Sequence, residues 1–120
     1  MQHEWNDSKP IYWQLRDRTI ALILDGSLEQ GDALPSVRQV AAEFQLNPIT
    51  VSKAYQALVD EGVVEKKRGL GMFVCDGARE KLLDSERQKF LKDEWPLVVR
   101  RIQRLGLDIK QLIKKLGSDL

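Results

Sequence analysis

Two helix-start signals stand close together in the middle of the chain, and their spacing limits what the residues around them can form. Ser36 is followed three residues later by Gln39, a pattern in which each side chain can bond the other residue's amide at a helix start. Asn47 precedes Pro48, and these residue types are favoured at the N-cap and at the first helical position. The predicted elements are a helix over 36–44, a turn over 45–47 and a second helix over 48–61.

A small β-hairpin is expected directly after the second helix. Apolar and β-branched residues over 63–67 and 72–75 flank the glycine-rich turn 68–71. Upstream, apolar residues recur at helical spacing over 10–25, and a loop rich in glycine follows over 26–35. Three helices followed by a hairpin is the order of a winged helix-turn-helix. The predicted fold class is therefore mostly α with a small β-hairpin.

The C-terminal third of the chain is predicted to be helical and to form an interface. A heavily charged helix is expected over 78–93, an interruption at Trp95–Pro96, and a final amphipathic helix over 109–117. Its apolar residues are Leu82, Leu83, Phe90, Leu97, Val98, Ile102, Leu105, Ile109, Leu112, Ile113 and Leu116. A domain of about 75 residues has little core surface to receive them all, so contact with a second copy is the more economical expectation. We predict a winged helix-turn-helix domain over 1–76 and a short C-terminal helical dimerisation region over 77–120.

The distribution of charge along the chain says more about a nucleic-acid partner than the net charge does. The chain has a net charge of +1, which does not by itself indicate a nucleic-acid partner. Residues 1–76 hold 8 Lys/Arg and 11 Asp/Glu, a net of −3, and residues 77–120 hold 11 and 7, a net of +4. Two windows inside the acidic part contain no acid, namely 47–59 and 66–75. Because binding depends on the charge that faces the phosphates, these two windows are the candidate DNA-facing segments.

The side chains in these windows suit contacts with DNA. The outer face of the helix over 48–61 carries Thr50, Ser52 and Lys53, which are small or cationic and can enter a major groove. Arg38 starts the preceding helix, which crosses the DNA backbone in this architecture. The hairpin segment 66–71 is basic and contains two glycines, which suits a minor groove or a phosphate. Taken alone, the helix face fits an ordinary solvated surface equally well.

Residues 10–75 contain a series of short motifs, namely Pro10–Leu15, Gly26–Leu28, Gly31–Arg38, Asn47-Pro48-x-Thr50-Val51-x-Lys53-Ala54-Tyr55-x-x-Leu58, Glu61–Gly62 and Gly69-x-Gly71. Together these motifs resemble the DNA-binding domain of the GntR family of bacterial transcription regulators. The helical tail resembles that of the YtrA-type subgroup, which lacks the large effector domain of its relatives. Some relatives carry arginine where this chain has Pro48 and Ser52, so its base preference is expected to differ from theirs.

The resemblance implies a function, partners and a set of contact residues. It implies a transcriptional regulator, expected to be a repressor, that binds a pseudo-palindromic double-stranded DNA operator as a homodimer. The helix over 48–61 would lie in the major groove and the wing over 66–71 at the minor groove or backbone. The residues expected to contact DNA are Arg38, Asn47, Pro48, Thr50, Ser52, Lys53, Lys67, Arg68 and Gly69. An unknown small-molecule effector is possible, and three arginines at 100, 101 and 104 fit either an anion site or a solvated basic face, so no effector site is assigned.

Composition narrows the other possibilities. One cysteine and one histidine allow neither an intramolecular disulfide nor a Cys/His metal cluster, and Cys75 is expected to be a small core residue. No paired carboxylates, Ser/His/Asp set or phosphate-binding glycine loop appears, so we expect no enzyme and no cofactor. With no apolar run of membrane-spanning length and a polar N-terminus, we expect no membrane association and a cytoplasmic location. The alternative function is a winged helix that serves only protein contact, which the net charge of −3 over 1–76 would suit.

Overall fold

The computed structural model describes residues 5–119, and its contacts divide the chain into two compact units, Met1–Leu83 and Asp84–Leu120. The sequence predicted a boundary between residues 76 and 77. The first unit continues to Leu83 because Ala78 and Leu82, on the first turns of the next helix, are buried in its core. Their burial adds two apolar side chains to a small core, which favours keeping these turns with the first unit.

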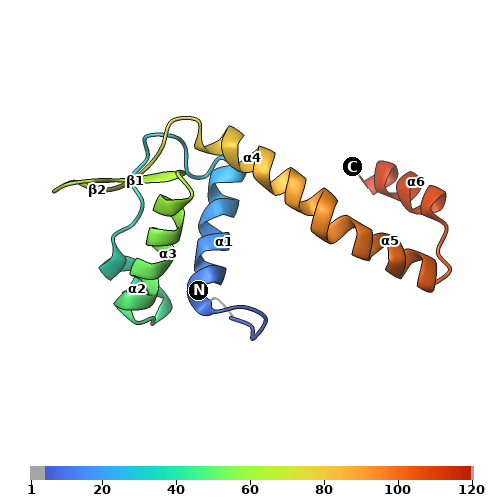
Figure 1. Cartoon of the computed structure of the whole chain (residues 1–120), viewed down its shortest axis with the longest axis horizontal. Coiled ribbons are helices and arrows are strands. Elements are labelled where there is room, and N and C mark those ends of the chain that lie inside the picture. The colour runs from blue at the N-terminus through green and yellow to red at the C-terminus, as the bar shows by residue number, and fades with distance from the viewer. Residues whose placement is uncertain (1–4, 120) are drawn as a thin grey trace. The chain divides into compact units, whose positions relative to one another are not determined.

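Three helices form the body of the first unit, and they begin where the capping signals predict (Figure 1). They are α1 (Ile11–Leu24), α2 (Val37–Phe44) and α3 (Pro48–Asp60), and α3 packs against both of the others. The Ser36 hydroxyl accepts a hydrogen bond from the Gln39 amide at 3.1 Å, and the Gln39 side chain accepts from the Ser36 amide at 2.8 Å. Gln45, with a φ of 55°, ends α2 in the left-handed conformation and starts the predicted short turn.

The hairpin consists of β1 (Val64–Lys67) and β2 (Gly71–Val74), paired antiparallel with Val64 opposite Val74. The segment that was predicted as a loop over 26–35 forms an isolated β-bridge with the hairpin near its end, with Ala33 opposite Phe73. The amide of Leu34 donates to the Met72 carbonyl at 2.8 Å, and the amide of Val74 donates to the Asp32 carbonyl at 2.9 Å. These bonds pair the backbone groups of β2 and fix the hairpin to the helical body. The predicted fold class, mostly α with a small hairpin, is confirmed.

The core of the first unit lies between the helices and the hairpin. Its most deeply buried large side chains are Ile23, Val51, Leu58, Val63 and Val64. The Cys75 side chain packs against this core, and burial raises the pKa of its thiol. A raised pKa disfavours the reactive thiolate, in agreement with the predicted packing role.

The second part of the chain is helical, with α4 (Ala78–Lys89), the π-helical turn η1 (Phe90–Glu94), α5 (Trp95–Arg104) and α6 (Ile109–Asp119). The interruption predicted at Trp95–Pro96 takes the form of that π-turn. Pro96 has no amide hydrogen and its ring crowds the carbonyl four residues earlier, so a wider turn before it relieves the conflict. No helix among residues 5–119 is long and apolar enough to span a bilayer.

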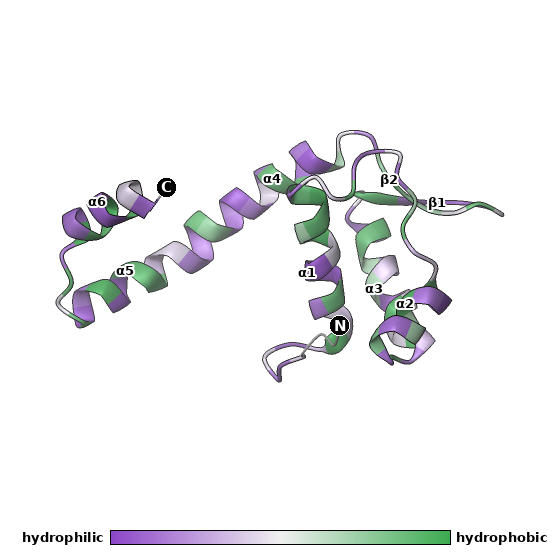
Figure 2. Ribbon diagram, turned by 180° about the vertical axis from the view of Figure 1, so that it is seen from behind, coloured by the Kyte–Doolittle hydropathy of each residue, from purple (hydrophilic) through white to green (hydrophobic). Residues whose placement is uncertain are grey.

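The helices of the second unit lack an apolar core of their own. Among the residues that the structure describes, none in η1, α5 or α6 is buried. Figure 2 shows apolar and polar residues alternating along α5 and α6, as in helices with two distinct faces. The exposed large apolar residues there are Phe90, Leu91, Trp95, Leu97, Val98, Leu105, Leu107, Ile109, Leu112, Ile113 and Leu116.

Candidate nucleic-acid interface

The start of α3 is fixed by its own cap. The side-chain oxygen of Asn47 accepts a hydrogen bond from the Ile49 amide at 2.9 Å, and Pro48 occupies the first turn. Because the Asn47 oxygen serves the cap, the NH2 of its carboxamide is the group that it can offer to DNA. The backbone amides of this turn give the helix start a partial positive charge that favours a phosphate.

The outward face of α3 carries the polar residues that the sequence assigned to it. Ser52 and Lys53 are exposed and Thr50 is half-buried, whereas Val51, Ala54, Tyr55 and Leu58 are buried on the other side. Ile49, at the tip of the helix, is 74% exposed. So large an apolar surface at a helix start is available to pack on a thymine methyl group.

A groove brings the start of α2, the outward face of α3 and the hairpin together. It has a volume of about 480 Å³. Its polar or charged lining residues are Ser36, Gln39, Ser52, Gln56, Lys66 and the hydroxyl-bearing Tyr55, and its apolar ones include Leu34, Leu70 and Met72. The predicted contact residue Ser52 therefore lies beside the wing. Arg38 lies exposed on the first turn of α2, between two residues that line this groove, Val37 and Gln39.

The wing presents its lysines on two different faces. Side chains alternate along a strand, and Lys66 lines the groove, whereas Lys67 lies on the other face. There the Lys67 ammonium is 3.6 Å from a Glu65 carboxylate oxygen and 4.9 Å from the centroid of the Phe73 ring. A contact between Lys67 and DNA remains a prediction, and Lys66 lay in the predicted wing but was not among the predicted contact residues. The period of two along residues 64–67 would have separated them.

The turn at the wing tip has the geometry that its glycines permit. The Leu70 amide donates to the Lys67 carbonyl at 2.9 Å, so residues 67–70 form a β-turn. Gly69 has a φ of +78°, the left-handed conformation that favours glycine at this place in a type II turn. Arg68 is exposed, and the Leu70 side chain next to it is 73% exposed. The tip thus offers one cation and one unburied apolar side chain, of which the sequence reasoning singled out only Arg68.

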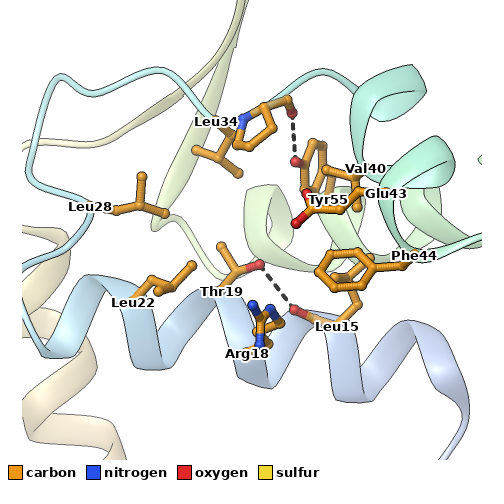
Figure 3. A pocket seen from close by; sticks show the side chains of 11 residues that line it. Leu15, Arg18, Thr19, Leu22, Leu28, Leu34, Val40, Glu43, Phe44 and Tyr55 are labelled. Carbon is orange, nitrogen blue, oxygen red and sulfur yellow. Dashed lines mark hydrogen bonds between the residues drawn. The ribbon is translucent and has the colours of Figure 1, made fainter. Parts of the chain in front are cut away.

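Hydrogen bonds and packing fix the position of α3, whose outward face is part of this surface. The Tyr55 hydroxyl donates to the Pro35 carbonyl at 2.6 Å, which ties α3 to the segment before α2 (Figure 3). Burial raises the pKa of Tyr55 to about 12. The pocket drawn there has a volume of about 180 Å³ and is lined mostly by aliphatic side chains of α1, α2 and the 26–35 loop. The two hydrogen bonds drawn in it, from Thr19 to Leu15 and from Tyr55 to Pro35, both join groups of the protein.

A buried arginine joins α1 to the end of α3. The Arg16 guanidinium donates to both carboxylate oxygens of Glu61, with Nε 2.7 Å from Oε2, and also to Asp17 at 2.6 Å. Burial lowers the pKa of Arg16, but the bonds and charges of Glu61 and Asp17 outweigh it and raise the pKa above its ordinary value. The sequence reasoning did not identify this pair, because its residues lie 45 positions apart.

The comparisons with known proteins agree with this geometry. A sequence model of the family described as "Bacterial regulatory proteins, gntR family" matches residues 11–74. The HTH-type transcriptional repressor YtrA of Bacillus subtilis (strain 168) is 32% identical over 123 residues, which cover 100% of this chain and 94% of that protein. A solved GntR family transcriptional regulator from Listeria monocytogenes has a TM-score of 0.77 at 27% identity, with 95% of this chain and 98% of that one covered. YtrA from Sulfolobus acidocaldarius, a GntR-family transcription factor, has a TM-score of 0.58 at 35% identity over 73% of this chain and 93% of its own.

The family match covers α1 to β2, the elements that form and support the candidate interface. The match to the Bacillus subtilis relative continues through the helical tail, so the likeness is not confined to the winged helix. The chain therefore belongs to the gntR family of bacterial regulatory proteins and is a DNA-binding transcription regulator with a winged helix-turn-helix domain.

Proposed function

We propose that α3 lies in the major groove of a specific operator and that the hairpin contacts the adjacent minor groove or backbone. The observation that carries this proposal is the groove shared by α3 and the hairpin, at which Ser52 and Lys66 both lie. No acidic residue lies within 47–59 or 66–75, so the surface meets the phosphates without charge repulsion from these segments.

Each contact residue has a role that follows from its chemistry. Lys53 pairs with guanine or with a phosphate, while Ile49 and the Thr50 methyl pack on thymine methyl groups. Asn47 and the helix start hold a phosphate, and Arg38 contacts the backbone or a base edge from α2. Arg68 and Gly69 approach the minor groove from the wing tip. Lys67, also in the wing, is expected to contact a phosphate through its long side chain. On α3, Pro48 and Ser52 form part of the surface that faces the bases.

The apolar faces of α5 and α6 are proposed to pair with those of a second copy. Leu97, Leu105, Ile113 and Leu116 are 58–62% exposed, and a folded chain in water rarely leaves so many large apolar side chains uncovered. Two-fold pairing of the tails would place two α3 helices on two half-sites, and so the operator would be a pseudo-palindrome. A dimer bound there would act as a repressor, the activity in the name of the Bacillus subtilis relative.

Selection of bound sequences from a pool of random duplexes tests the DNA contacts. We expect one enriched sequence with two related half-sites. With the selected operator, Arg38→Ala and Lys53→Ala should each weaken binding about tenfold, as for loss of a charged contact to a base or phosphate. Lys89→Ala on α4 is the control, because it removes the same charge outside the proposed interface. Full affinity in both variants would show that the groove-facing surface lies elsewhere.

The salt dependence of binding separates this proposal from a winged helix used for protein contact alone. A DNA-binding surface releases counterions, so the logarithm of the binding constant falls steeply with the logarithm of salt concentration. A slope near zero, or no enrichment of any duplex, would support the protein-contact function instead.

The dimer has its own test. Ile113→Asp places a charge on the apolar face of α6, whereas Gln111→Asp places the same charge on its polar face. We expect the first variant to have the mass of a monomer by sedimentation or light scattering at micromolar concentration, and the second to keep the mass of a dimer. A monomeric mass for the unchanged chain would contradict the proposal.

A further inference from the structure

One side chain of α1 touches the outward face of α3. The Lys53 ammonium lies 4.4 Å from the centroid of the Tyr12 ring, within the range of a cation–π contact. Tyr12 is half-buried and packs against the core, whereas Lys53 is exposed. The Tyr12 ring also meets the Trp13 ring edge-on, with centroids 6.2 Å apart. A ring held by its surroundings therefore lies against a lysine that faces solvent.

The ring beside Lys53 is uncharged, so it does not cancel the positive charge of the lysine. No carboxylate among residues 5–119 forms an ion pair with Lys53. Lys67 in the wing differs, because its ammonium has the Glu65 carboxylate beside it. An aromatic face attracts a cation without cancelling its charge, so the Lys53 ammonium keeps its full attraction for a phosphate or a guanine.

A restrained lysine binds with a smaller loss of freedom. A lysine side chain loses considerable rotamer entropy when it is fixed. If it is already restrained in the free protein, the entropy cost of binding DNA is smaller. The Tyr12 ring covers one side of the ammonium, and the ammonium has three N–H donors in all, so donors remain for the DNA.

We propose that Tyr12 is a positioning residue for DNA recognition, whose ring holds the Lys53 ammonium at the place where it contacts the operator. This inference rests on the proposed function, in which Lys53 touches DNA. Tyr12 itself need not contact DNA: its effect passes through Lys53. The size of a cation–π contact at an exposed site corresponds to about a two- to fivefold change in Kd.

A double-mutant cycle measured on the selected operator tests the proposal. Tyr12→Leu removes the ring and should raise Kd about two- to fivefold, the range of an exposed cation–π contact. Lys53→Met should raise Kd further, and Tyr12→Leu should then add nothing in the Lys53→Met background. Tyr12→Phe keeps the ring face and should bind within about twofold of the unchanged chain. Lys89→Met serves as the control for loss of one positive charge.

A graded series keeps the test valid if Tyr12→Leu folds poorly. Phenylalanine with one, two or three ring fluorines has nearly the shape of the natural ring but a weaker negative potential on its face. Operator affinity should fall stepwise with each fluorine at position 12, and this trend should vanish with Lys53→Met. A role of Tyr12 in packing alone would give no such trend.

The outcomes separate the two levels of the proposal. Unchanged Kd in Lys53→Met would overturn the proposed contact of Lys53 with DNA, and the positioning role with it. Weaker binding in Lys53→Met, with a Tyr12→Leu effect that persists in that background, would overturn only the positioning role. A loss in Tyr12→Phe would show that the hydroxyl contacts DNA directly, and tighter binding in Tyr12→Leu would show that the ring holds Lys53 away from it.

Discussion

The link between α1 and the end of α3 can be weakened with one substitution, Glu61→Gln. The Arg16 side chain is 7% exposed, and Glu61, its partner through two hydrogen bonds, is 34% exposed. Glutamine has the same size but no charge, and it turns one acceptor oxygen into a donor NH2 that faces the guanidinium. The variant therefore loses one charge-assisted hydrogen bond and leaves Arg16 with Asp17 as its remaining anionic partner.

The expected loss of stability lies between two limits. Removing one partner of a fully buried ion pair costs about 3–5 kcal/mol, and an exposed pair contributes less than about 1 kcal/mol. Because Arg16 is buried but Glu61 is partly solvated, and Asp17 remains, we expect about 2 kcal/mol. For a unit of this size that corresponds to a fall in the unfolding midpoint of about 10 °C.

Glu65→Gln provides the matched control. Glu65 pairs with Lys67 at 3.6 Å, and both side chains are about half exposed, so the same substitution should cost less than about 0.5 kcal/mol there. Thermal unfolding followed by circular dichroism, at one fixed protein concentration, measures both variants. Equal midpoints for Glu61→Gln and Glu65→Gln would refute the view that burial of Arg16 makes its pair important.

Further substitutions in and beside α3 test its packing through the free energy of unfolding in denaturant. Leu58→Ala, at a side chain with no exposed surface, should cost about 2–5 kcal/mol, and a loss below 1 kcal/mol would mean that the core is not packed as described. Tyr55→Phe should cost about 1 kcal/mol at pH 8 through the lost bond to Pro35. Since the pKa of Tyr55 is raised to about 12 from 10.0, the unfolded chain loses this proton first. The free energy of unfolding of the unchanged protein should therefore fall between about pH 10 and 12 relative to that of Tyr55→Phe, until the variant is the more stable of the two. A difference between the two proteins that does not change with pH would contradict this. Gly62→Ala should cost about 1–2 kcal/mol because Gly62 has a φ of +75°, and Lys81→Ala should restore little of it, because the close contact is with a flexible lysine end.

The sequence predicted those parts of the fold that local chemistry determines. Ser36 and Gln39 form their capping box, and Asn47 with Pro48 starts α3, because a cap needs only groups within three residues of each other. The hairpin was equally predictable, since the glycines at 69 and 71 mark the turn between two short segments of strand-forming residues. The outer face of α3 was predicted as well: Ser52 and Lys53 are exposed, whereas Val51, Ala54, Tyr55 and Leu58 are buried on the other side.

Features that depend on distant residues could not be predicted in this way. The pairing of Arg16 with Glu61 and the contact of Lys53 with Tyr12 each join α1 to α3, and no local pattern signals which residues will meet. The β-bridge between Ala33 and Phe73 forms only because β2 offers an unpaired edge to the segment before Leu34. The two faces of the hairpin are the intermediate case, because the alternation that separates Lys66 from Lys67 is visible in the sequence once the strand is known.

The net negative charge of residues 1–76 and the few cations on the candidate interface have a consequence for how the proposed dimer would bind. If Arg38, Lys53, Lys67 and Arg68 each neutralise one phosphate, one protomer gives a salt slope of about −3.6 and a dimer about −7 on B-form DNA. Ile113→Asp, which is expected to separate the protomers, should therefore halve the slope on the full operator, whereas Gln111→Asp should leave it unchanged. A slope that stays near −7 in a variant with the mass of a monomer would mean that one protomer carries all the phosphate contacts. The proposal that each winged helix makes half of the phosphate contacts, with the protomers paired through α5 and α6, would then be wrong.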